Sequence, residues 1–487
     1  MKSYAGEMGD LAADVRPLRF NMPLTRRVAG GMVACADILI GLTVSALAQF
    51  VDTGITQATQ LSFWLAAIYA LLVFATLHVA GKYKLERLSH PLRESMTIVP
   101  LCMAVSILMV LFVNGIGIVD RVSADWAVMF FAGTTAGMCA FRFAIAQLVV
   151  SLSQRGYVAR SIAVVGSSAQ AERLINTLRE KDEPWLRIIG FFDDRATRSP
   201  GRLAGRPYCG TIEDLIDYAR ATQVDEVVVT LPWSNTERIT QIIQRLKVLP
   251  ANVRLAPEGI AGSLNGASLT NLKGVPLLTV YDRPISEWSW VLKSLEDRIL
   301  GTLMLVLLSP VMLLCALAIK LDSRGPVFFK QPRYGYNNKL IEVWKFRSMY
   351  IDKTDLNAEA LTTRDDPRVT RVGNILRRTS LDELPQLFNV VMGDMSVVGP
   401  RPHAVKAKAA GKLYQDVVTE YAVRHKIKPG ITGWAQVNGW RGETDTEEKI
   451  LKRVEHDIYY MENWSLWLDL KIIARTALVG LWGQNAY

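Results

Sequence analysis

The chain has 487 residues, of which 50% are hydrophobic, and a formal net charge of +10 at pH 7. This length exceeds one ordinary core, and the apolar content excludes a typical soluble protein. The positive charge fits an anionic membrane face or phosphorylated substrates. We expect no nucleic-acid partner, because no motif interleaves basic and aromatic residues. The five cysteines show no CxxC or Cys–His spacing, so the sequence predicts neither a structural metal nor a disulfide framework.

Residues 1–150 are predicted to form a bundle of four transmembrane helices. The apolar segments, each long enough to span a bilayer, are about 28–50, 61–80, 96–119 and 125–149. Lys and Arg gather before the first segment, between the second and third, and after the fourth, whereas the other two loops contain only Arg121. By the positive-inside rule, the N-terminus and everything after residue 150 are cytoplasmic.

Residues 151–280 alternate between strand-like and helix-like patterns. The strand-like pieces are SIAVVG, LRIIGFFDD, DEVVVTL and ANVRLAP. This alternation predicts a Rossmann-like α/β module with a doubly wound parallel sheet. Gly166 ends the first strand where a phosphate-binding loop would begin, but a dinucleotide fingerprint needs three glycines. Nucleotide or nucleotide-sugar sensing stays open, and the single glycine favours a structural or assembly role.

Residues 281–487 begin with an apolar segment at about 295–321 that is broken at its midpoint by Ser309 and Pro310. Basic residues flank both of its ends, which places both ends on the cytoplasmic side. We therefore predict a re-entrant membrane helix. The Ser309 hydroxyl is expected to help satisfy the carbonyl that Pro310 leaves without a donor. A kinked fifth span is the alternative, and it would place the basic domain that follows outside the cell.

The strongest chemical signal is the adjacent pair Asp382 and Glu383 in TSLDELPQ. Thr379 or Ser380 is predicted to cap a helix there, with both carboxylates near its positive end. In a basic setting, one carboxylate can hold Mg²⁺ and the other can attack phosphorus. A surface capping motif is the simpler interpretation of the pair alone. The basic cluster around glycines and strand-like residues is typical of phosphate binding or of a membrane-facing surface; its members include Arg333, Lys345 and Arg347.

Residues from about 291 to 485 resemble the catalytic domain of the polyprenyl-phosphate hexose-1-phosphate transferases, the monotopic phosphoglycosyl transferases. The matching pieces are LLSPVMLLCALAIKLDSRGPVFFKQPRYG, KFRSM, DPRVTRVGNILRRTSLDELPQLFNVVMGDMSVVGPRPH, KPGITGWAQVNGWRG and YYMENWSLWLDLKI. The four apolar segments and the α/β module are similar to the N-terminal half of the large bacterial members. The expected fold is therefore a membrane protein with an α+β monotopic catalytic domain.

The resemblance implies transfer of a hexose-1-phosphate from a UDP-sugar to undecaprenyl phosphate, with release of UMP, as the first membrane step of exopolysaccharide biosynthesis. Asp382 is then the nucleophile and Glu383 the principal Mg²⁺ ligand beside it. Candidates for binding phosphate or substrate are Arg333, Lys345, Arg347, Arg401 and, as an accessory acid, Asp457. The protein would lie in the bacterial inner membrane, in contact with its lipid. UDP-glucose is the expected donor and UDP-galactose the alternative; a homo-oligomer stays open.

Three other functions were weighed. A membrane-anchored nucleotide-sugar dehydratase needs GxxGxxG and Tyr-x-x-x-Lys, which the α/β segment lacks. An ordinary glycosyltransferase would release UDP, and no DxD-type metal motif at a strand end supports it. A non-enzymatic scaffold for polysaccharide assembly needs neither the acidic pair nor the basic residues.

Overall fold

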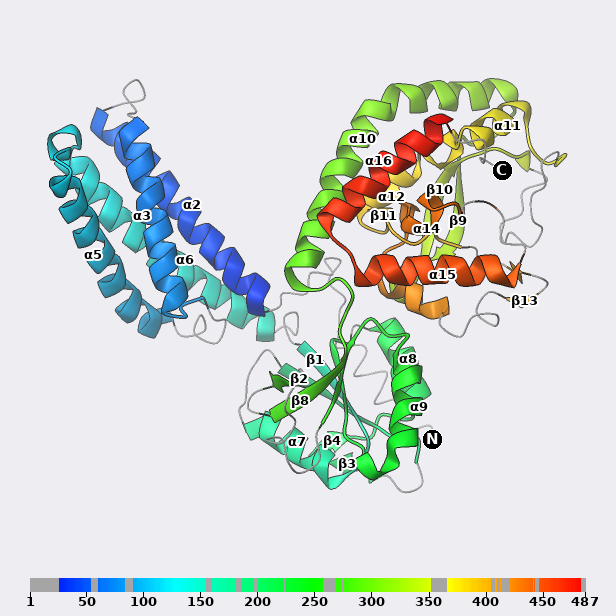
Figure 1. The fold of residues 1–487 in the computed structure, drawn as a ribbon, viewed down its shortest axis with the longest axis horizontal. Coiled ribbons are helices and arrows are strands. Elements are labelled where there is room, and N and C mark those ends of the chain that lie inside the picture. Colours follow the sequence, from blue (N-terminus) through cyan, green and yellow to red (C-terminus); the bar gives the residue numbers. More distant parts are fainter. Residues whose placement is uncertain are drawn as a thin grey trace. The chain divides into compact units, whose positions relative to one another are not determined.

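A computed structural model shows the architecture of the chain (Figure 1). It describes residues 26–482 except 54–59, 84–90, 155–159, 181–185, 196–199, 223, 257–268, 273–274, 352–365, 404–407, 410–411, 414–420, 441 and 443–445. The described chain divides into two compact units: a helical unit before residue 160 and a main unit from Arg160 onward. The boundary expected near residue 280 lies within the main unit.

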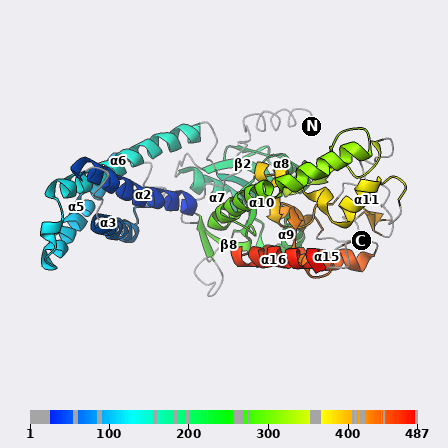
Figure 2. The same cartoon turned by 90° about the horizontal axis from the view of Figure 1, so that it is seen from above.

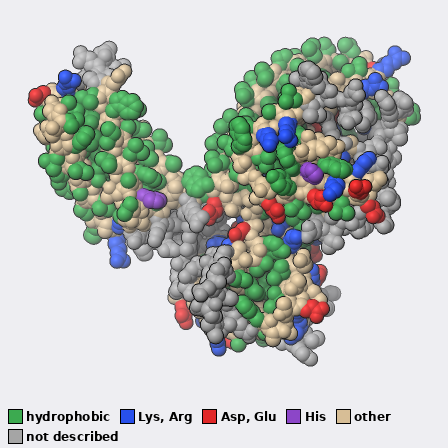
Figure 3. All heavy atoms as spheres, in the orientation of Figure 1, with side chains coloured by type: hydrophobic (Ala, Val, Ile, Leu, Met, Phe, Trp, Pro, Cys, Tyr) green, Lys and Arg blue, Asp and Glu red, His purple; other side chains and the backbone are tan. Residues whose placement is uncertain are grey.

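The helical unit contains four long apolar helices, α2 (Arg26–Thr53), α3 (Gln60–Val79), α5 (Pro91–Gly115) and α6 (Ala124–Gln154). They pack on a shared core that includes Tyr69, Ile98 and Phe130. Leucines such as Leu39 and Leu111 are exposed on the outside, and Figure 3 shows hydrophobic side chains over most of the visible face of this unit. Such an exterior suits lipid rather than water. With α10, described below, these are the five described helices long and apolar enough to cross a membrane.

A buried ion pair lies inside the helical unit. Arg142 on α6 donates to both carboxylate oxygens of Asp37 on α2, at 2.8 and 2.7 Å. Each residue is only 1% exposed. The Arg142 guanidinium also lies 5.7 Å from the centre of the Tyr83 ring. Charged groups within apolar helices are costly unless they are paired, so this bidentate contact ties α2 to α6.

The main unit begins with a six-stranded sheet in the order β2-β1-β5-β6-β8-β7. The four strands predicted from the sequence run parallel to one another, and they are β1 (Arg160–Val165), β2 (Leu186–Phe192), β5 (Glu226–Val229) and β6 (Asn252–Leu255). Two antiparallel strands that were not predicted extend the sheet, β7 (Leu269–Leu272) and β8 (Val275–Tyr281). A short hairpin joins β3 (Arg202–Leu203) to β4 (Arg206–Pro207).

Alternate residues of the central strands feed two cores, one on each face of the sheet. Ile162 and Val164 face a cluster with Leu174 of α7 (Ala169–Glu180). Ala163 and Val165 face a second cluster, which includes residues of α8 (Ile212–Ala221) and α9 (Thr236–Leu246). Helices on both faces of a mainly parallel sheet define a doubly wound module.

Helix α10 (Glu287–Asp322) follows the module as one helix of 36 residues with Pro310 inside it. Figure 1 shows α10 changing direction along its length, with one arm beside α16 and the other near α11. The Ser309 hydroxyl donates to the Val306 carbonyl at 2.8 Å, which is the carbonyl one turn before Pro310. The two sides of this bend pack on different clusters, since Leu300 and Met304 join one and Met312, Cys315 and Ile319 join another.

The rest of the main unit packs against α10. A hairpin of β9 (Phe328–Tyr334) and β10 (Leu340–Phe346) comes first, followed by α11 (Arg371–Arg378) and α12 (Gln386–Met392). Strand β11 (Ser396–Val398) pairs in parallel with β14 (Gly430–Thr432). A 3-10 segment η8 (Tyr421–Lys426) and a short helix α14 (Trp434–Val437) flank β14. Helices α15 (Glu447–Glu462) and α16 (Leu466–Trp482) follow one another along one edge (Figure 2).

Candidate active site

Asp382 and Glu383 lie in a 3-10 turn, η7 (Leu381–Glu383), that runs into α12. Neither predicted cap is present: Thr379 Oγ1 donates back to Ile375 O, and Ser380 has a left-handed backbone (φ 57°) without a side-chain capping bond. The turn instead rests on an apolar cluster through Leu381 and Leu384. Tertiary packing, rather than the predicted cap, therefore places the two carboxylates.

Two cations from distant parts of the chain contact Glu383. Lys345 Nζ, near the end of β10, donates to Glu383 Oε1 at 3.0 Å. The Arg401 guanidinium contacts both carboxylate oxygens, at 2.7 Å to Oε1 and 3.1 Å to Oε2. None of the described residues donates a hydrogen bond to the Asp382 carboxylate. The acidic pair is thus asymmetric, because Glu383 is held by two cations and Asp382 has an open carboxylate.

The surroundings shift the pKa values of the two carboxyls in opposite directions. Burial raises the pKa of Asp382, and the negative charge of Glu383 raises it further, whereas Lys345 lowers it. The resulting pKa of Asp382 is about 6. Burial also opposes ionisation of Glu383, but Arg401 and Lys345 outweigh it and lower the pKa of Glu383 well below its ordinary value. Both groups are therefore ionised at neutral pH, with Asp382 the more basic of the two. A more basic carboxylate is the better nucleophile.

Close backbone packing positions Arg401. Gly399 of the GPRPH motif lies directly against Gly430 and Gly433 of the KPGITGW motif. A Cβ atom added to Gly430 would lie 2.1 Å from Gly399 N, and one added to Gly433 would lie 2.3 Å from Gly399 O. Only glycine permits this approach. Gly399 N also donates to Thr432 O at 2.8 Å. The segment that carries Arg401 is thereby held directly beside β14.

The structure places the remaining predicted residues as follows. Arg333 on β9 donates to Pro402 O at 3.4 Å and to the Gln331 side chain at 2.6 Å, so it contacts the segment after Arg401. Arg347 donates to backbone carbonyls at the end of α10 and makes no hydrogen bond or ion pair with the acidic pair. Of the predicted set, Lys345 and Arg401 contact Glu383 directly.

Asp457 on α15 is 2% exposed and pairs with Arg424 of η8 at 2.7 Å. Burial raises the pKa of Asp457, and Arg424 opposes that shift. Arg424 also donates to Arg401 O at 2.9 Å and contacts His403, whose pKa is lowered well below its ordinary value by burial and by neighbouring cations. Neither Arg424 nor His403 was a candidate from the sequence. The available signals were that His403 ends the GPRPH motif and that Arg424 lies four residues before KPGITGW.

A small pocket adjoins this ion pair. Its lining combines three arginines with Asp457 and with residues from the α14 region, in full Arg401, Arg424, Arg453, Asp457, Gly433, Ala435, Gln436 and Trp440. Arg453 donates to Trp440 O at 2.7 Å and so holds the segment after α14 in place. Arg401 therefore belongs both to this lining and to the Glu383 contact.

The acidic pair fits the Mg²⁺ that sequence analysis expects. Carboxylate oxygens are suitable ligands, and Mg²⁺ in phosphate-handling sites is commonly held by one or two carboxylates together with substrate phosphates. Asp382 offers an open carboxylate, and Glu383 Oε2, which accepts one bond from Arg401, keeps a second lone pair. Within the described ranges no cluster of three or more acidic, His or Cys side chains could hold a metal alone. A metal here would therefore need the substrate phosphates as further ligands.

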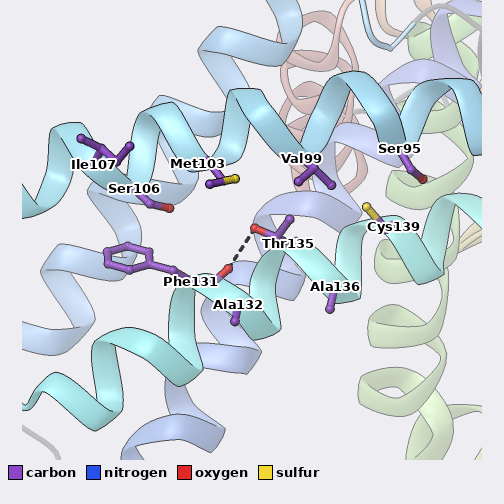
Figure 4. Close-up of a pocket in the computed structure, with 10 residues that line it drawn as sticks. All are labelled: Ser95, Val99, Met103, Ser106, Ile107, Phe131, Ala132, Thr135, Ala136 and Cys139. Atoms are coloured by element: carbon purple, nitrogen blue, oxygen red, sulfur yellow. Dashed lines mark hydrogen bonds between the residues drawn. The ribbon is translucent and has the colours of Figure 1, made fainter.

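Another pocket lies between α5 and α6 of the helical unit (Figure 4). Its lining is mainly apolar: Ser95, Val99, Met103, Ser106, Ile107, Phe131, Ala132, Thr135, Ala136 and Cys139. The Thr135 and Ser106 hydroxyls donate to carbonyls of their own helices, at 2.9 Å each. This pocket presents no acid or base for catalysis.

The crevice at the carboxyl ends of β1 and β5 is where a doubly wound sheet would bind a nucleotide. Here Ser167 donates both its backbone N–H and its hydroxyl to Asp193 Oδ2, at 3.1 and 2.8 Å. Ser168 Oγ donates to Thr230 O at 2.6 Å. The two Ser167 donors and the Ser168 hydroxyl are thus already engaged within the protein, and Asp193 also pairs with Arg238 at 3.2 Å.

Two protein families match the chain. Residues 288–483 match the bacterial sugar transferase family, and residues 78–257 match the CoA-binding domain family. In the crevice described above, the Ser167 donors that could contact a phosphate of CoA instead donate to Asp193. The first match includes α10, the acidic pair and both cations that contact Glu383.

Several named proteins are similar to the chain over most of its length. The chain is 42% identical over 359 residues to the UDP-glucose:undecaprenyl-phosphate glucose-1-phosphate transferase of Escherichia coli (strain K12), covering 73% of this chain and 75% of that protein. It is 41% identical over 331 residues to the undecaprenyl-phosphate glucose phosphotransferase of Komagataeibacter xylinus, covering 68% and 60%. A Klebsiella pneumoniae protein with the same name as that of E. coli is 40% identical over 362 residues, covering 74% and 76%. The chain therefore belongs to the bacterial sugar transferase family and is a transferase enzyme.

Proposed function

We propose that this protein transfers glucose-1-phosphate from UDP-glucose to undecaprenyl phosphate, as the first membrane step of exopolysaccharide biosynthesis. The names of the similar proteins support the two substrates. The asymmetric acidic pair carries the chemical part of the proposal, because Glu383 is held by Lys345 and Arg401 while Asp382 keeps an open, more basic carboxylate.

The proposed reaction has two steps. An Asp382 carboxylate oxygen attacks the sugar-bearing phosphorus of UDP-glucose, the bond from that phosphorus to the bridging oxygen breaks, and UMP leaves with the electron pair. A phosphate oxygen of undecaprenyl phosphate then attacks the same phosphorus and displaces Asp382, which gives undecaprenyl diphosphate glucose. Splitting one transfer into two displacements at phosphorus is the advantage of covalent catalysis.

The neighbouring residues bind and orient the phosphates. Lys345 and Arg401 are partly exposed, at 20% and 34% of their side chains, so each can contact a phosphate while it still faces Glu383. Bound Mg²⁺, held by Asp382 and Glu383 with the donor phosphates, would neutralise charge on those phosphates. Among the other candidates, Arg333 and Asp457 support the Arg401 segment through Pro402 and Arg424.

The released nucleotide tests this proposal first. Full-length protein in nanodiscs is given undecaprenyl phosphate, Mg²⁺ and either UDP-glucose or UDP-galactose, and the nucleotide is identified by chromatography. We expect UMP, with UDP-glucose turning over faster. Release of UDP would refute transfer of a phosphosugar, and faster turnover of UDP-galactose would change the sugar but keep the chemistry.

Two isosteric variants separate the roles of the acidic pair. Asp382→Asn should abolish both turnover and the covalent phosphosugar adduct, which mass spectrometry of the intact protein can detect. Glu383→Gln keeps the nucleophile, so an adduct should still form, with slower turnover and a weaker dependence on Mg²⁺. An adduct on Asp382→Asn, or an unchanged metal titration for Glu383→Gln, would contradict these assignments.

We further propose that α10 enters the cytoplasmic leaflet and returns, so that the N-terminus and the catalytic residues are both cytoplasmic. The bend of α10 and the Ser309–Val306 bond support this topology. The test places single cysteines at Lys330 and Arg121 in a cysteine-free background and labels each with an impermeant maleimide. Lys330→Cys should react only from the cytoplasmic face and Arg121→Cys only from the opposite face. Labelling of both from the same outer face would indicate a fifth span.

A further inference from the structure

Arg347 is 5% exposed, and its guanidinium faces the C-terminal end of α10. Its Nη2 donates to Ser323 O at 2.8 Å and to Ser323 Oγ at 2.9 Å, and its Nη1 donates to Arg324 O at 2.6 Å. Cations stabilise the C-terminus of a helix, where carbonyls lack partners. Nε is buried and has no partner within the described residues. With so little exposed surface, this side chain has no open face for a substrate phosphate.

Gly325 makes room for this contact. Its φ is +129°, and a Cβ at this position would lie 2.0 Å from Arg347 Nη1 and 2.2 Å from Ile351 Cδ1. Any other residue would be strained and would push against the guanidinium. The glycine after α10 and the arginine after β10 therefore form one joint, which we call the Gly325–Arg347 joint.

The joint lies next to Lys345 and to the apolar cluster under the acidic turn. Lys345, two residues before Arg347, contacts Glu383 at 3.0 Å. Phe346 belongs to the same apolar cluster as Cys315 and Ile319 of α10, and Leu381 of the acidic turn packs on that cluster. Ser348 O accepts from Thr370 N at 3.0 Å, directly before α11. Residues 345–348 thus connect the end of α10, the Lys345 contact and the start of α11.

We propose that Arg347 is a positioning residue that holds the end of α10 against β10 and so sets the placement of Lys345 and of the acidic turn. Sequence analysis considered it a phosphate-binding residue. This inference rests on the proposed function, because the acidic pair is the site that it positions. Moving a reacting group by about 1 Å can reduce the rate by about 10²-fold, so loss of the joint should act on turnover more than on donor binding.

The experiment compares Arg347→Met, Gly325→Ala and the double variant as full-length proteins in nanodiscs, with kcat and KM for UDP-glucose as readouts. Arg347→Met should reduce kcat by roughly 10- to 100-fold, with KM unchanged within about twofold. Gly325→Ala should do the same although glycine has no side chain that could bind phosphate. The double variant should be little worse than either single one, because both break the same joint. Lys330→Met removes one exposed charge from the same hairpin and should leave kcat unchanged.

Different results overturn the inference. A large rise in KM with kcat intact for Arg347→Met would make Arg347 a phosphate ligand, and fully additive effects would show that Gly325 and Arg347 act separately. If Gly325→Ala does not fold, Ser323→Ala replaces it and removes one acceptor, and Arg347→Lys should recover most of the kcat because an ammonium group still donates to the helix end. Release of UDP by the parent protein, or an adduct on Asp382→Asn, would instead overturn the proposed function. The non-additive effects of Gly325→Ala and Arg347→Met on kcat would still test the joint.

Discussion

Replacing Asp457 by Asn is expected to lower the melting temperature of the catalytic part of the main unit. Asp457 and Arg424 are each 2% exposed and lie 2.7 Å apart. The substitution keeps the size of the side chain but removes its charge. Arg424 would then remain as a buried cation that has lost its carboxylate partner; its other contacts include the Arg401 carbonyl, His403 and Tyr421.

The magnitude follows from the burial of the pair. Breaking a buried ion pair by removing one partner costs about 3–5 kcal/mol, because the other charge is left uncompensated. For a domain of about 150–250 residues, each kcal/mol lowers the melting temperature by roughly 2–4 °C, so we expect a decrease of roughly 6–20 °C. Arg424 holds the backbone of Arg401, so activity should fall together with stability.

Thermal unfolding in nanodiscs, followed by tryptophan fluorescence, measures this effect. Glu455→Gln is the matched control, because Glu455 lies on the same helix and pairs with Lys452 in an exposed contact, with side chains 51% and 42% exposed. An exposed pair contributes at most about 1 kcal/mol, so the control should melt within a few degrees of the parent protein.

The result also separates two roles for Asp457. If Asp457→Asn melts like the parent and only KM for UDP-glucose rises, Asp457 is a substrate ligand and the structural interpretation is wrong. If the melting temperature falls strongly while the protein that stays folded still binds UDP-glucose, the ion pair has the structural role of holding the Arg401 segment.

Three further predictions test the site and the helical unit. Turnover should decrease as the pH falls below about 6, because the raised pKa of Asp382 leaves the nucleophile protonated there. Lys345 lowers the pKa of Asp382, so Lys345→Met should move this acidic limb of the pH–rate profile to higher pH. A limb that does not move would contradict the assignment. Ser380→Val should lower the free energy of unfolding by about 1–3 kcal/mol, because φ is 57° at this residue, whereas Ser380→Gly should change it little. Equal effects of the two substitutions on thermal unfolding would argue against a left-handed backbone at this position. Asp37→Asn should lower the melting temperature of the helical unit, because it removes the carboxylate that pairs with the buried Arg142, at a cost of about 3–5 kcal/mol. If the double variant Asp37→Leu with Arg142→Leu recovers the melting temperature of the parent, the ion pair is the cause.

Local patterns in the sequence predicted the elements well. The long apolar runs became α2, α3, α5, α6 and α10, although α5 ends at Gly115, before the predicted limit of 119. The alternation of strands and helices correctly indicated the parallel sheet, because hydrophobic periodicity is a local property. Strands β7 and β8 were missed, since β8 joins the sheet by antiparallel pairing with β6 and β7 joins it only through β8, and local periodicity does not reveal such pairing.

The family motifs identified Asp382, Glu383, Lys345 and Arg401 as candidates without showing how they contact one another. A sequence reports which side chains are available, but the partner of a buried charge is chosen by packing between segments many residues apart. The structure decided that Lys345 and Arg401 both contact Glu383, that Asp457 pairs with Arg424, and that Arg347 faces the end of α10. It also showed that the acidic turn is placed by its apolar support and not by a helix cap. Composition, periodicity and motifs thus determined the kind of protein and which residues are candidates for its chemistry, whereas only tertiary structure assigned those residues their partners, because burial makes each charge depend on the neighbours that the fold brings to it.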